Sequence, residues 1–469
     1  MKCLLKESML MMDETRVGLA VITDKAVLRT NSPYQDAVLL SQLLKEAMKE
    51  GGLGRKNPDI PLADIIEPGM SVLLKPNWAL HYNQKRGCGM DCMITHPFFI
   101  KAALKEVFAA KPSRVMIGDA PIQSAKFGEL PNLDWLKTGD INNSCPVEII
   151  DFRRDVTDKY GKVDSNRRGL ENFVMFDLGH DSLLEPITES AGIFRNTNYD
   201  PQALASTHRP GHHQYLLAKE PFEADVIINL PKLKAHRKAG ITAAVKNLVG
   251  INGNKGYLPH HRIGGSAQGG DCYEGRFILK RLAESFLDIS NTRINKPDRP
   301  FWRFCVNGLI ELQRIISPHV NKSLEGSWYG NDTVWRMVLD LNRIAMYGKI
   351  DGSMSSTPVR CIYSLTDGII AGQHNGPLAP EPIHLGAVTF SCSSLFADMA
   401  HAALMHFDWH KIALLRYGFE SNYSYSLVRH KAEELKVCAE GKTYSFDETA
   451  ISYGKNFVPP DGWLGHIEP

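Results

Sequence analysis

Residues 225–250 of this chain read DVIINLPKLKAHRKAGITAAVKNLVG. The apolar run at 226–228 is typical of a strand that is covered on both faces. After Pro231, side chains that carry or can gain a positive charge occupy every second position: Lys232, Lys234, His236 and Lys238. In an extended chain this spacing places them on one side. The segment therefore predicts a buried strand that leads directly into a polar site.

The clustered positive charge predicts that this site binds an anion. Three ammonium groups and an imidazole on one side repel one another unless they face water or a negative charge. A solvated basic edge is the alternative interpretation, but open α/β sheets bind ligands just past the carboxyl ends of their strands. We expect Lys232 and Lys234 to contact an anionic substrate and His236 to transfer a proton.

Residues 240–250 predict a short helix of small residues that ends at a glycine. Thr242 and Lys246 would lie one turn apart, on a face that Asn247 shares. Small neighbours leave Lys246 open either as a point charge for phosphate or carboxylate, or as a deprotonated nucleophile. An ordinary surface lysine is the alternative. We place Lys246 among the catalytic candidates and Asn247 among the substrate-binding ones.

Polar residues continue downstream of this helix. His260 and His261 are adjacent, and either could donate to an anion or act as an acid or base. Adjacent side chains rarely converge on one metal ion, and Arg262 adds a further cation for the substrate. The glycine-rich segment 264–271, GGSAQGGD, predicts a lid and is not a Walker loop, because no GK[ST] follows. Asp271 or Asp367 would orient an imidazole or bind a cation.

Three motifs together resemble the domain of unknown function 362 family. They are KPNW at 75–78, the segment 225–250, and DGIIAGQHNGPL at 367–378. The resemblance extends over roughly residues 18–416 and implies a fold and a site, because no general activity is established for the family. Some relatives append a ferredoxin-like cluster domain. This chain has no CxxCxxCxxxCP run, so we do not expect an iron–sulfur cluster.

A more distant resemblance links the segment to the racemases that use a nickel-pincer nucleotide. In them a histidine after a strand is the proton-transfer base, a lysine after a small-residue helix bears the cofactor, and a later histidine binds the metal. By position, the resemblance gives these roles to His236, to Lys246, and to His260 or His261. It implies a shared scaffold and makes a divalent metal or a nucleotide-derived cofactor a candidate. The glycine-rich stretch before the lysine is replaced here by 242–244, TAA, so nickel itself is not implied.

Composition is that of an enzyme-sized chain with a large core. The chain has 469 residues, 43% of them hydrophobic, and a net charge of +2. This charge argues against general nucleic-acid binding and makes the basic segment a local feature. No run of about 18 apolar residues predicts a transmembrane segment. The N-terminal sequence MKCLLKESMLMMDETR has acidic residues and no continuous apolar core, so we expect no secretory signal.

Nine scattered cysteines predict a reduced, cytoplasmic protein. Cys88 and Cys92 form the one close pair, with His96 nearby. Such a pair could begin a metal site, but a further ligand would have to come from elsewhere in the chain. Ordinary buried or surface thiols are the favoured interpretation.

Segments in which apolar residues recur every two residues alternate with segments in which they recur about every 3.6 residues. This alternation predicts a Rossmann-like α/β fold of parallel strands flanked by helices. Strands are expected at 16–23, 71–74 and 114–117, and helices at 36–49 and at 97–110, the latter capped by Thr95. This order places three candidate substrate contacts near one sheet edge: Lys75, Asn77 and Asp119. Asparagine and aspartate at strand ends are alternatively plain turn or cap residues.

The sequence suggests three parts. Residues 1–136 form an N-terminal α/β part, 137–214 an irregular insertion or covering subdomain, and 215–469 a C-terminal α/β part. Within the last part we expect helices at 276–291, 301–317, 333–347 and 395–406, and strands at 359–364 and 386–391. Asp367 would lie in the loop between those strands. Segment 301–317 is expected to pack on the core rather than on a membrane surface.

Two classes of function fit these observations. In the first, the protein is an enzyme of isomerase, epimerase or transferase type that acts on a small anionic molecule through a cleft of lysines and histidines. In the second, it is a non-catalytic protein that binds a cofactor, or an iron–sulfur or electron-transfer accessory protein. The sequence identifies neither the substrate nor the oligomeric state.

Overall fold

The structure is a computed structural model of the 469-residue chain. It describes residues 12–29, 33–130, 145–157, 163–164, 167–294, 296–318, 323–420 and 424–469. The predicted boundary between residues 136 and 137 lies outside these ranges, as does most of the N-terminal segment that was examined for a secretory signal.

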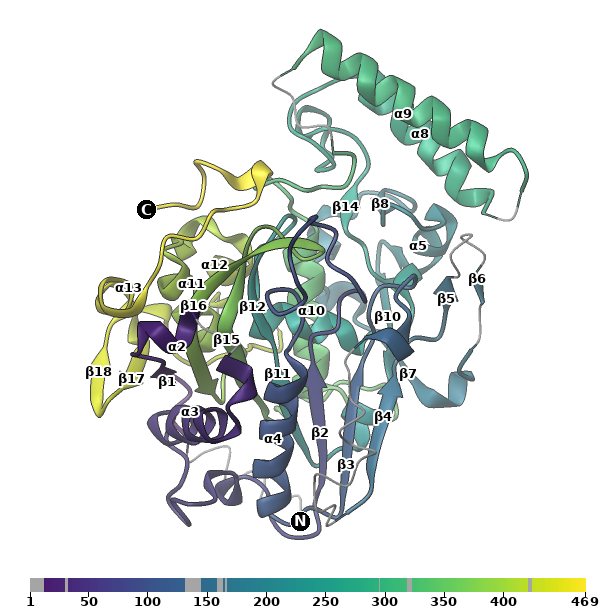
Figure 1. Cartoon of the computed structure of the whole chain (residues 1–469). Helices are drawn as coiled ribbons and strands as arrows, with labels where there is room; N and C mark the ends of the chain where they lie inside the picture. The colour runs from purple at the N-terminus through teal and green to yellow at the C-terminus, as the bar shows by residue number, and fades with distance from the viewer. Residues whose placement is uncertain are drawn as a thin grey trace.

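A mixed sheet of eleven strands forms the centre of the protein (Figure 1). Its main path runs through β18 (Lys442–Tyr444), β17 (Lys436–Ala439), β1 (Arg16–Val21), β16 (Ala379–Ser391), β15 (Ile362–Asn375), β11 (Val226–Leu230), β2 (Ser71–Pro76), β3 (Arg114–Asp119) and β4 (Val147–Asp151). Two more strands, β12 (Lys232–His236) and β13 (Gly240–Thr242), extend from β15. The neighbours from β15 to β4 pair in parallel, whereas β15 and β16 form an antiparallel pair. The predicted α/β class with a mostly parallel sheet is confirmed.

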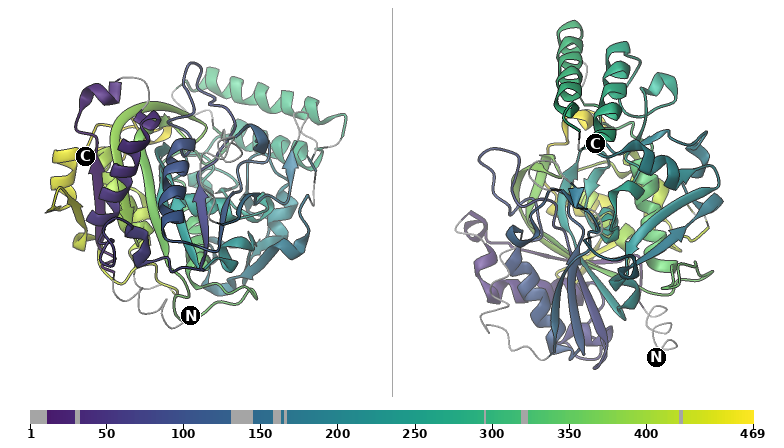
Figure 2. Two further views of the ribbon diagram at one scale, coloured as in Figure 1. Left: turned by 60° about the horizontal axis from the view of Figure 1, so that its bottom comes forward. Right: turned by 90° about the vertical axis from the view of Figure 1, so that its right-hand side faces the viewer.

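Helices cover both faces of this sheet (Figures 1 and 2). The helices α3 (Ala37–Glu50) and α4 (Pro97–Ala109) pack on one face, and α10 (Val334–Tyr347) and α11 (Ser394–Met405) pack on the other. Successive residues of β11 enter opposite cores: Ile228 packs with α3 and α4, and Ile227 with α10 and α11. The run at 226–228 is therefore a strand buried on both faces, as predicted.

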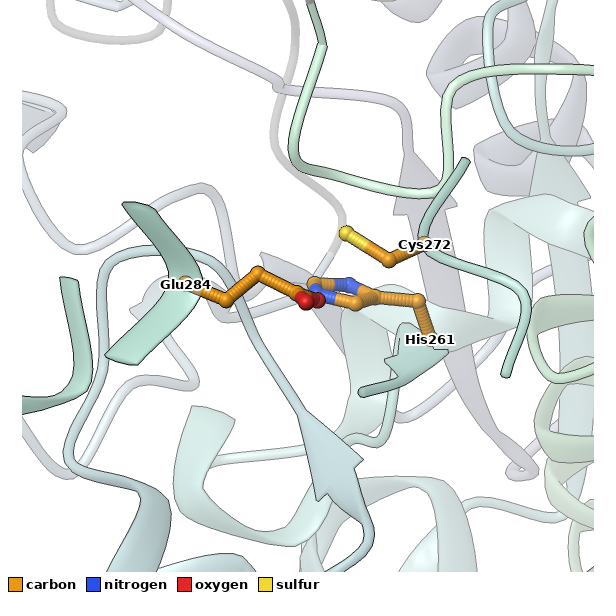
Figure 3. A group of neighbouring side chains, drawn as sticks. All are labelled: His261, Cys272 and Glu284. Atoms are coloured by element: carbon orange, nitrogen blue, oxygen red, sulfur yellow. The ribbon is translucent and has the colours of Figure 1, made fainter. Parts of the chain in front are cut away.

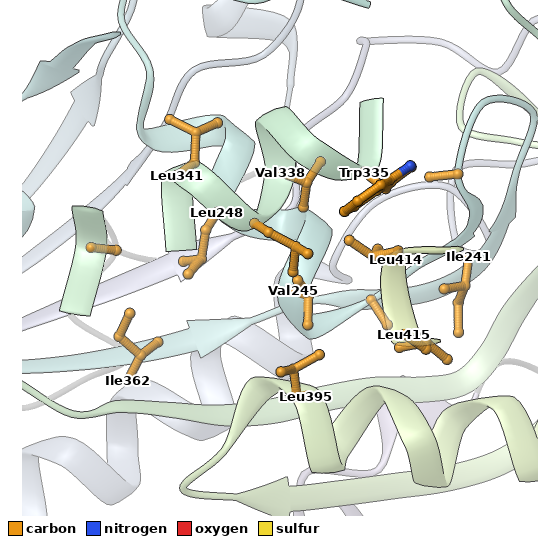
Figure 4. Packing of buried hydrophobic residues seen from close by; sticks show 14 of the residues in the cluster. Ile241, Val245, Leu248, Trp335, Val338, Leu341, Ile362, Leu395, Leu414 and Leu415 are labelled. Carbon is orange, nitrogen blue, oxygen red and sulfur yellow. The ribbon is translucent and has the colours of Figure 1, made fainter. Parts of the chain in front are cut away.

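The second core also holds the helix that follows the basic segment. Figure 4 shows Val245 and Leu248 packed against Trp335 and Val338 of α10, with Leu395 of α11 nearby. Residues 240–242 form β13 rather than the start of that helix, so the helix predicted from residue 240 is limited to α7 (Ala244–Asn247), followed by a 3₁₀ turn. The antiparallel pairing of β13 with β12 overrides the local preference of this segment.

Two local predictions were wrong. Asp367 lies inside β15, not in a loop. The glycines near it serve close packing instead of a turn: a Cβ on Gly368 would lie 2.9 Å from the carbonyl oxygen of Ala387 on β16. At the start of α4 the capping residue is His96, whose Nδ1 accepts from the Phe98 amide at 3.2 Å, while the Thr95 hydroxyl bonds the carbonyl of Leu230.

Smaller elements surround the main sheet. A three-stranded sheet contains β7 (Phe173–Asp177), β10 (His212–Ala218) and β9 (His208–Arg209), and two short pairs are β5 (Val156–Thr157) with β6 (Val163–Asp164) and β8 (Phe194–Arg195) with β14 (His261–Arg262). The short helices are α2 (Lys25–Arg29), α5 (Pro201–Thr207), α6 (Glu220–Glu223), α12 (Ala413–Gly418) and α13 (Phe446–Tyr453). The division into three parts stays a prediction, and β4 of the middle part belongs to the main sheet.

A helical hairpin, α8 (Ile278–Thr292) and α9 (Arg299–Ile316), projects from this body (Figures 1 and 2). Only Val306 and Gln313 of α9 are buried, and Phe304 is 75% exposed. The expectation that 301–317 packs on the core was therefore wrong, because α9 packs chiefly on α8. Across the described ranges, we find no helix with both the length and the apolar character that a membrane crossing requires.

Candidate functional site

A cavity of about 190 Å³ lies where β2, β3 and β11 end. These strands are parallel neighbours, so their carboxyl ends share one edge of the sheet. We call this space the cationic cavity. Seven of the predicted site residues line it: Asn77, Asp119, Lys234, His236, Lys246, Asn247 and His260.

Lys75 and Asp119 form a buried ion pair next to the cavity; Asp119 lines it, whereas the predicted site residue Lys75 lies outside the lining. The Lys75 Nζ lies 2.6 Å from Asp119 Oδ1, and the other carboxylate oxygen accepts from the Trp78 amide at 2.7 Å. Gly250 packs directly on this pair: a Cβ there would lie 1.9 Å from the Asp119 carboxylate, so this position requires glycine. The carboxylate of Asp119 is thus already committed to Lys75.

Two asparagine side chains connect this ion pair to Lys234. The amide oxygen of Asn247 accepts from Lys75 Nζ at 3.1 Å and from Asn77 at 2.8 Å. The amide oxygen of Asn77 accepts from Lys234 Nζ at 2.8 Å. Lys234 also donates to the carbonyl of Met93. Neutral oxygens therefore solvate the Lys234 ammonium, and none of these partners cancels its charge.

Lys246 is held at the cavity by the anchoring of α7. The Asp398 carboxylate accepts from the amides of Ala244 and Val245, at 2.7 and 3.0 Å, and so fixes the start of this short helix. The Nζ of Lys246 has no hydrogen-bond or ion-pair partner among the residues that the structure describes. An ammonium group in that position is available to a ligand.

Burial gives these lysines low pKa values. It lowers the pKa of Lys234 to about 7, and repulsion from Lys232 and Lys246 contributes. It likewise lowers the pKa of Lys246 to about 7, with added repulsion from Lys238 and Lys255. Each ammonium costs free energy in this apolar and cationic environment, and an anion in the cavity would offset that cost.

The backbone assigns different tautomers to the two histidines of the cavity. The Nδ1 of His236 accepts from the amides of Lys238 and Ala239, at 3.0 and 3.2 Å, so the proton of the neutral ring is on Nε2. His260 is the reverse: its Nδ1 donates to the carbonyl of Leu258 at 2.8 Å, so Nε2 keeps a lone pair. Burial and the nearby lysines lower both pKa values well below the ordinary range, so both rings are neutral. His236 is therefore a donor and His260 an acceptor.

Sequence reasoning missed five polar side chains that line the cavity: Trp78, Asn196, Tyr199, Thr242 and Lys255. Lys255 donates to the carbonyl of Ala120 at 3.2 Å, and burial lowers its pKa to about 8. The Nε1 of Trp78 and the hydroxyl of Thr242 are buried without a hydrogen-bond partner in the described part of the chain. Lys255 stands in a turn-forming NGNKG segment, which gave no periodic signal; Trp78 was quoted in the KPNW motif but not assigned a role.

Lys232 and Asp367 do not line the cavity. Their side chains form an ion pair of 2.8 Å with both residues 0% exposed, and the Asp367 carboxylate also accepts from the Tyr34 hydroxyl at 2.6 Å. The prediction that every second residue from 232 to 238 faces one side fails here. The pairing of β12 with β15 shifts register between Lys232 and Lys234, and Lys238 lies beyond the end of β12, where it faces Glu325 at 3.8 Å.

Three further predicted residues also lie outside the cavity lining. The Asp271 carboxylate accepts from the Thr333 hydroxyl at 2.6 Å and from the Asp332 amide at 2.9 Å, and burial raises its pKa to about 6. Arg262 faces Asp332 at 3.5 Å. His261 is buried beside Cys272 and Glu284. The glycine-rich segment thus joins β14 to α10 through Asp271, and a lid role for it stays a prediction.

Fold and site together define an α/β protein with a cationic cavity at the carboxyl edge of a mostly parallel sheet. The family described as Domain of unknown function (DUF362) matches residues 72–403. This match spans more than half of the chain, so the protein belongs to that family.

Individual relatives are more distant. The chain is 26% identical over 230 residues to Thylakoid-associated protein sll1697 of Synechocystis sp.; the match spans 49% of this chain and 51% of that protein, or about half of its length. A solved structure of a protein from Thermotoga maritima aligns with 74% of this chain and 53% of its own, at 10% identity and a TM-score of 0.30.

We predict that Asp367→Asn destabilises the fold strongly. The substitution leaves the buried Lys232 ammonium without its carboxylate partner. Loss of one partner of a buried ion pair lowers the free energy of unfolding by about 3–5 kcal/mol. Urea unfolding followed by circular dichroism measures this loss. The matched control is Glu148→Gln, which removes an exposed ion pair with Arg114 and should cost less than about 1 kcal/mol. Equal, small effects of both substitutions would show that Lys232 and Asp367 do not support the fold.

Proposed function

We propose that the protein is an enzyme that holds a small anionic substrate in the cationic cavity and moves a proton on it. The unpartnered Lys246 carries this proposal, because a half-buried ammonium without a counter-charge, among other lysines, is unfavourable unless a ligand supplies one. Lys234 and Lys255 add positive charge at the same cavity. The unpartnered Trp78 Nε1 and Thr242 hydroxyl add hydrogen-bond donors for a polar ligand.

The volume of the cavity favours a ligand of few heavy atoms. Pockets that hold drug-sized ligands have about 300–1,000 Å³, and the cationic cavity has about 190 Å³. A carboxylate or phosphate compound of small size suits it better than a nucleotide-derived cofactor does. We therefore assign no step to such a cofactor.

The two histidine tautomers favour an isomerase or epimerase. With the anionic group on the lysines, the Nε2 lone pair of His260 can take a proton from the adjacent carbon. The Nε2–H of His236 can then donate to the oxygen that gains negative charge. Return of the proton from His260 to a neighbouring carbon of the substrate completes an isomerisation. Epimerisation instead requires a second acid, for which the Nε2–H of His236 is the candidate, to deliver a proton to the opposite face of the same carbon. With a pKa of about 7, Lys246 is also partly a free amine and could attack a carbonyl substrate.

We propose a cytoplasmic location. The eight cysteines that the structure describes are all free thiols, which is typical of a reducing compartment. The similarity to a thylakoid-associated protein covers half of each chain and leaves the location as a proposal.

We predict that Lys246→Met weakens anion binding. Loss of one charged hydrogen-bond donor costs about 1.5–3 kcal/mol, which corresponds to a dissociation constant about 10- to 100-fold higher. Sulfate is the probe, and isothermal titration calorimetry measures its affinity. Lys442→Met, at an exposed lysine of β18, is the matched control and should bind as the native protein does. Unchanged affinity of the Lys246→Met variant would contradict the proposed site.

We predict that sulfate binding takes up protons and weakens as pH rises. The pKa of Lys234 and of Lys246 is about 7 in the free protein, and a bound anion stabilises their charged forms and raises both values. Binding is therefore strongest below about pH 7 and weakens above it, by up to about tenfold per pH unit for each lysine. Calorimetry in buffers of different ionisation enthalpy counts the protons. Lys246→Met should reduce the uptake, with Lys234 and Lys255 supplying the remainder; binding without pH dependence would be contrary to the expectation.

We predict that the protein exchanges a carbon-bound proton of its substrate with solvent. Small 2-hydroxy acids, 2-oxo acids and sugar acids are incubated with the protein in D2O, and NMR follows the loss of the proton next to the carboxylate. His260→Gln removes the acceptor nitrogen and should abolish exchange while sulfate still binds. Tight binding of such compounds without any exchange would instead favour the non-catalytic, cofactor-binding alternative. Intact mass would reveal an adduct on Lys246.

A further inference from the structure

Three potential metal ligands meet outside the cationic cavity, at the base of the α8–α9 hairpin. A ring nitrogen of His261, the Sγ of Cys272 and a carboxylate oxygen of Glu284 all lie within 4.8 Å of one another (Figure 3). The three residues are at most 4% exposed. They come from β14, from the segment after the glycine-rich loop, and from α8, so three successive elements of the chain converge on one point.

The cluster contains a buried nitrogen that the protein leaves unsatisfied. The Nδ1 of His261 is buried and has no hydrogen-bond partner among the described residues. A buried polar atom of this kind costs free energy unless a ligand, water or ion satisfies it. Cys272 and Glu284 form a hydrogen-bonded pair beside it. A thiol, a carboxylate and a lone imidazole nitrogen are the donor types that zinc prefers.

The surroundings support ligation by Glu284. The Gly264 amide donates to both carboxylate oxygens of Glu284, at 2.9 and 3.2 Å, and Arg281 lies 3.5 Å from Oε2. These contacts fix the orientation of the Glu284 carboxylate. Lys280 lies near the cluster, over the ring of Tyr273 at 4.8 Å. A thiolate and a carboxylate bring two negative charges, which neutralise a divalent ion, so this lysine does not oppose the centre.

We propose that His261, Cys272 and Glu284 hold a structural zinc ion. Zinc bonds of about 2.0–2.3 Å place tetrahedral ligands about 3.5 Å apart, so side-chain shifts of about an ångström close the site. A cavity of about 10 Å³ is lined by His261 and Glu284 but not by Cys272, so it offers room for about one water on the side of the cluster that these two ligands share. The metal replaces the thiol proton, which leaves to solvent. This inference does not depend on the proposed function.

Such an ion would fix the hairpin and one wall of the cationic cavity together. His261 begins β14, which pairs with β8, and Arg195 of β8 already contacts Asp288 of α8 at 2.9 Å. The ion would add a coordination link between β14 and α8, beside this ion pair. Because His260 precedes the ligand His261 directly, the metal would also restrain the loop that positions His260 in the cavity.

Metal analysis and cobalt substitution test the proposal on the full-length protein. Protein purified without metal-affinity resin is analysed by mass spectrometry of its elements, then stripped with chelator and titrated with Co²⁺ and with Zn²⁺. We expect one zinc per chain, and a cobalt complex with the absorption of a thiolate-to-cobalt charge transfer and of a four-coordinate ion. Added Zn²⁺ should raise the melting temperature of the stripped protein.

Variants distinguish zinc binding at this cluster from zinc binding elsewhere on the protein. Cys272→Ser should lose the charge-transfer band and the stoichiometric zinc, and Glu284→Gln should retain the band but bind the metal more weakly. Cys438→Ser alters another buried cysteine, remote on β17, and should behave as the native protein does. If Cys272→Ser does not fold, the cobalt spectrum of the native protein and the Glu284→Gln titration decide. A native protein without zinc and without the band, or a Cys272→Ser variant that keeps both, overturns the proposal.

Discussion

The burial of lysine ammonium groups with too few carboxylates is the constraint on which the candidate site depends. Two buried lysines have a carboxylate partner: Lys75 pairs with Asp119, and Lys232 with Asp367. These two are satisfied within the protein and support the fold. Lys234 and Lys255 are solvated by neutral oxygens, and Lys246 has no partner among the described residues. The same residue type therefore takes two roles, and the distribution of acidic side chains decides which.

The topology of the sheet creates this imbalance. Parallel strands bring the ends of β2, β3 and β11 to one edge, and the chain continues from β11 through Pro231 into β12 without leaving the sheet. The cationic segment is therefore built into the core and cannot turn outward to water. Asp398, which could have supplied a counter-charge, is instead committed to the amides that begin α7. Negative charge must then come from a ligand, if these lysines are to stay protonated.

Local patterns predicted most of the main strands and helices and the edge where the candidate site lies, because alternation and capping are local signals; they did not predict β13. These patterns could not show that Lys232 and Lys234 lie in different environments, because both stand on the same two-residue repeat. An irregularity in the pairing of β12 with β15 places only Lys234 at the cavity. Asp367 was misplaced because glycine beside it suggested a turn, whereas that glycine packs against β16. Lys255 and Trp78 reach the cavity through tertiary packing that no local pattern records.

The two adjacent histidines show most directly why position in sequence is not position in space. Neighbouring residues of an extended chain face opposite directions. His260 therefore lines the cationic cavity, while His261 turns to Cys272 and Glu284. A doublet that does not place both rings on one ion can instead connect two sites, here the cationic cavity and the proposed metal cluster. Under the two proposals, a shift at either ring would reach the other through a single peptide unit, so the geometry of the cavity and of the metal cluster would be coupled.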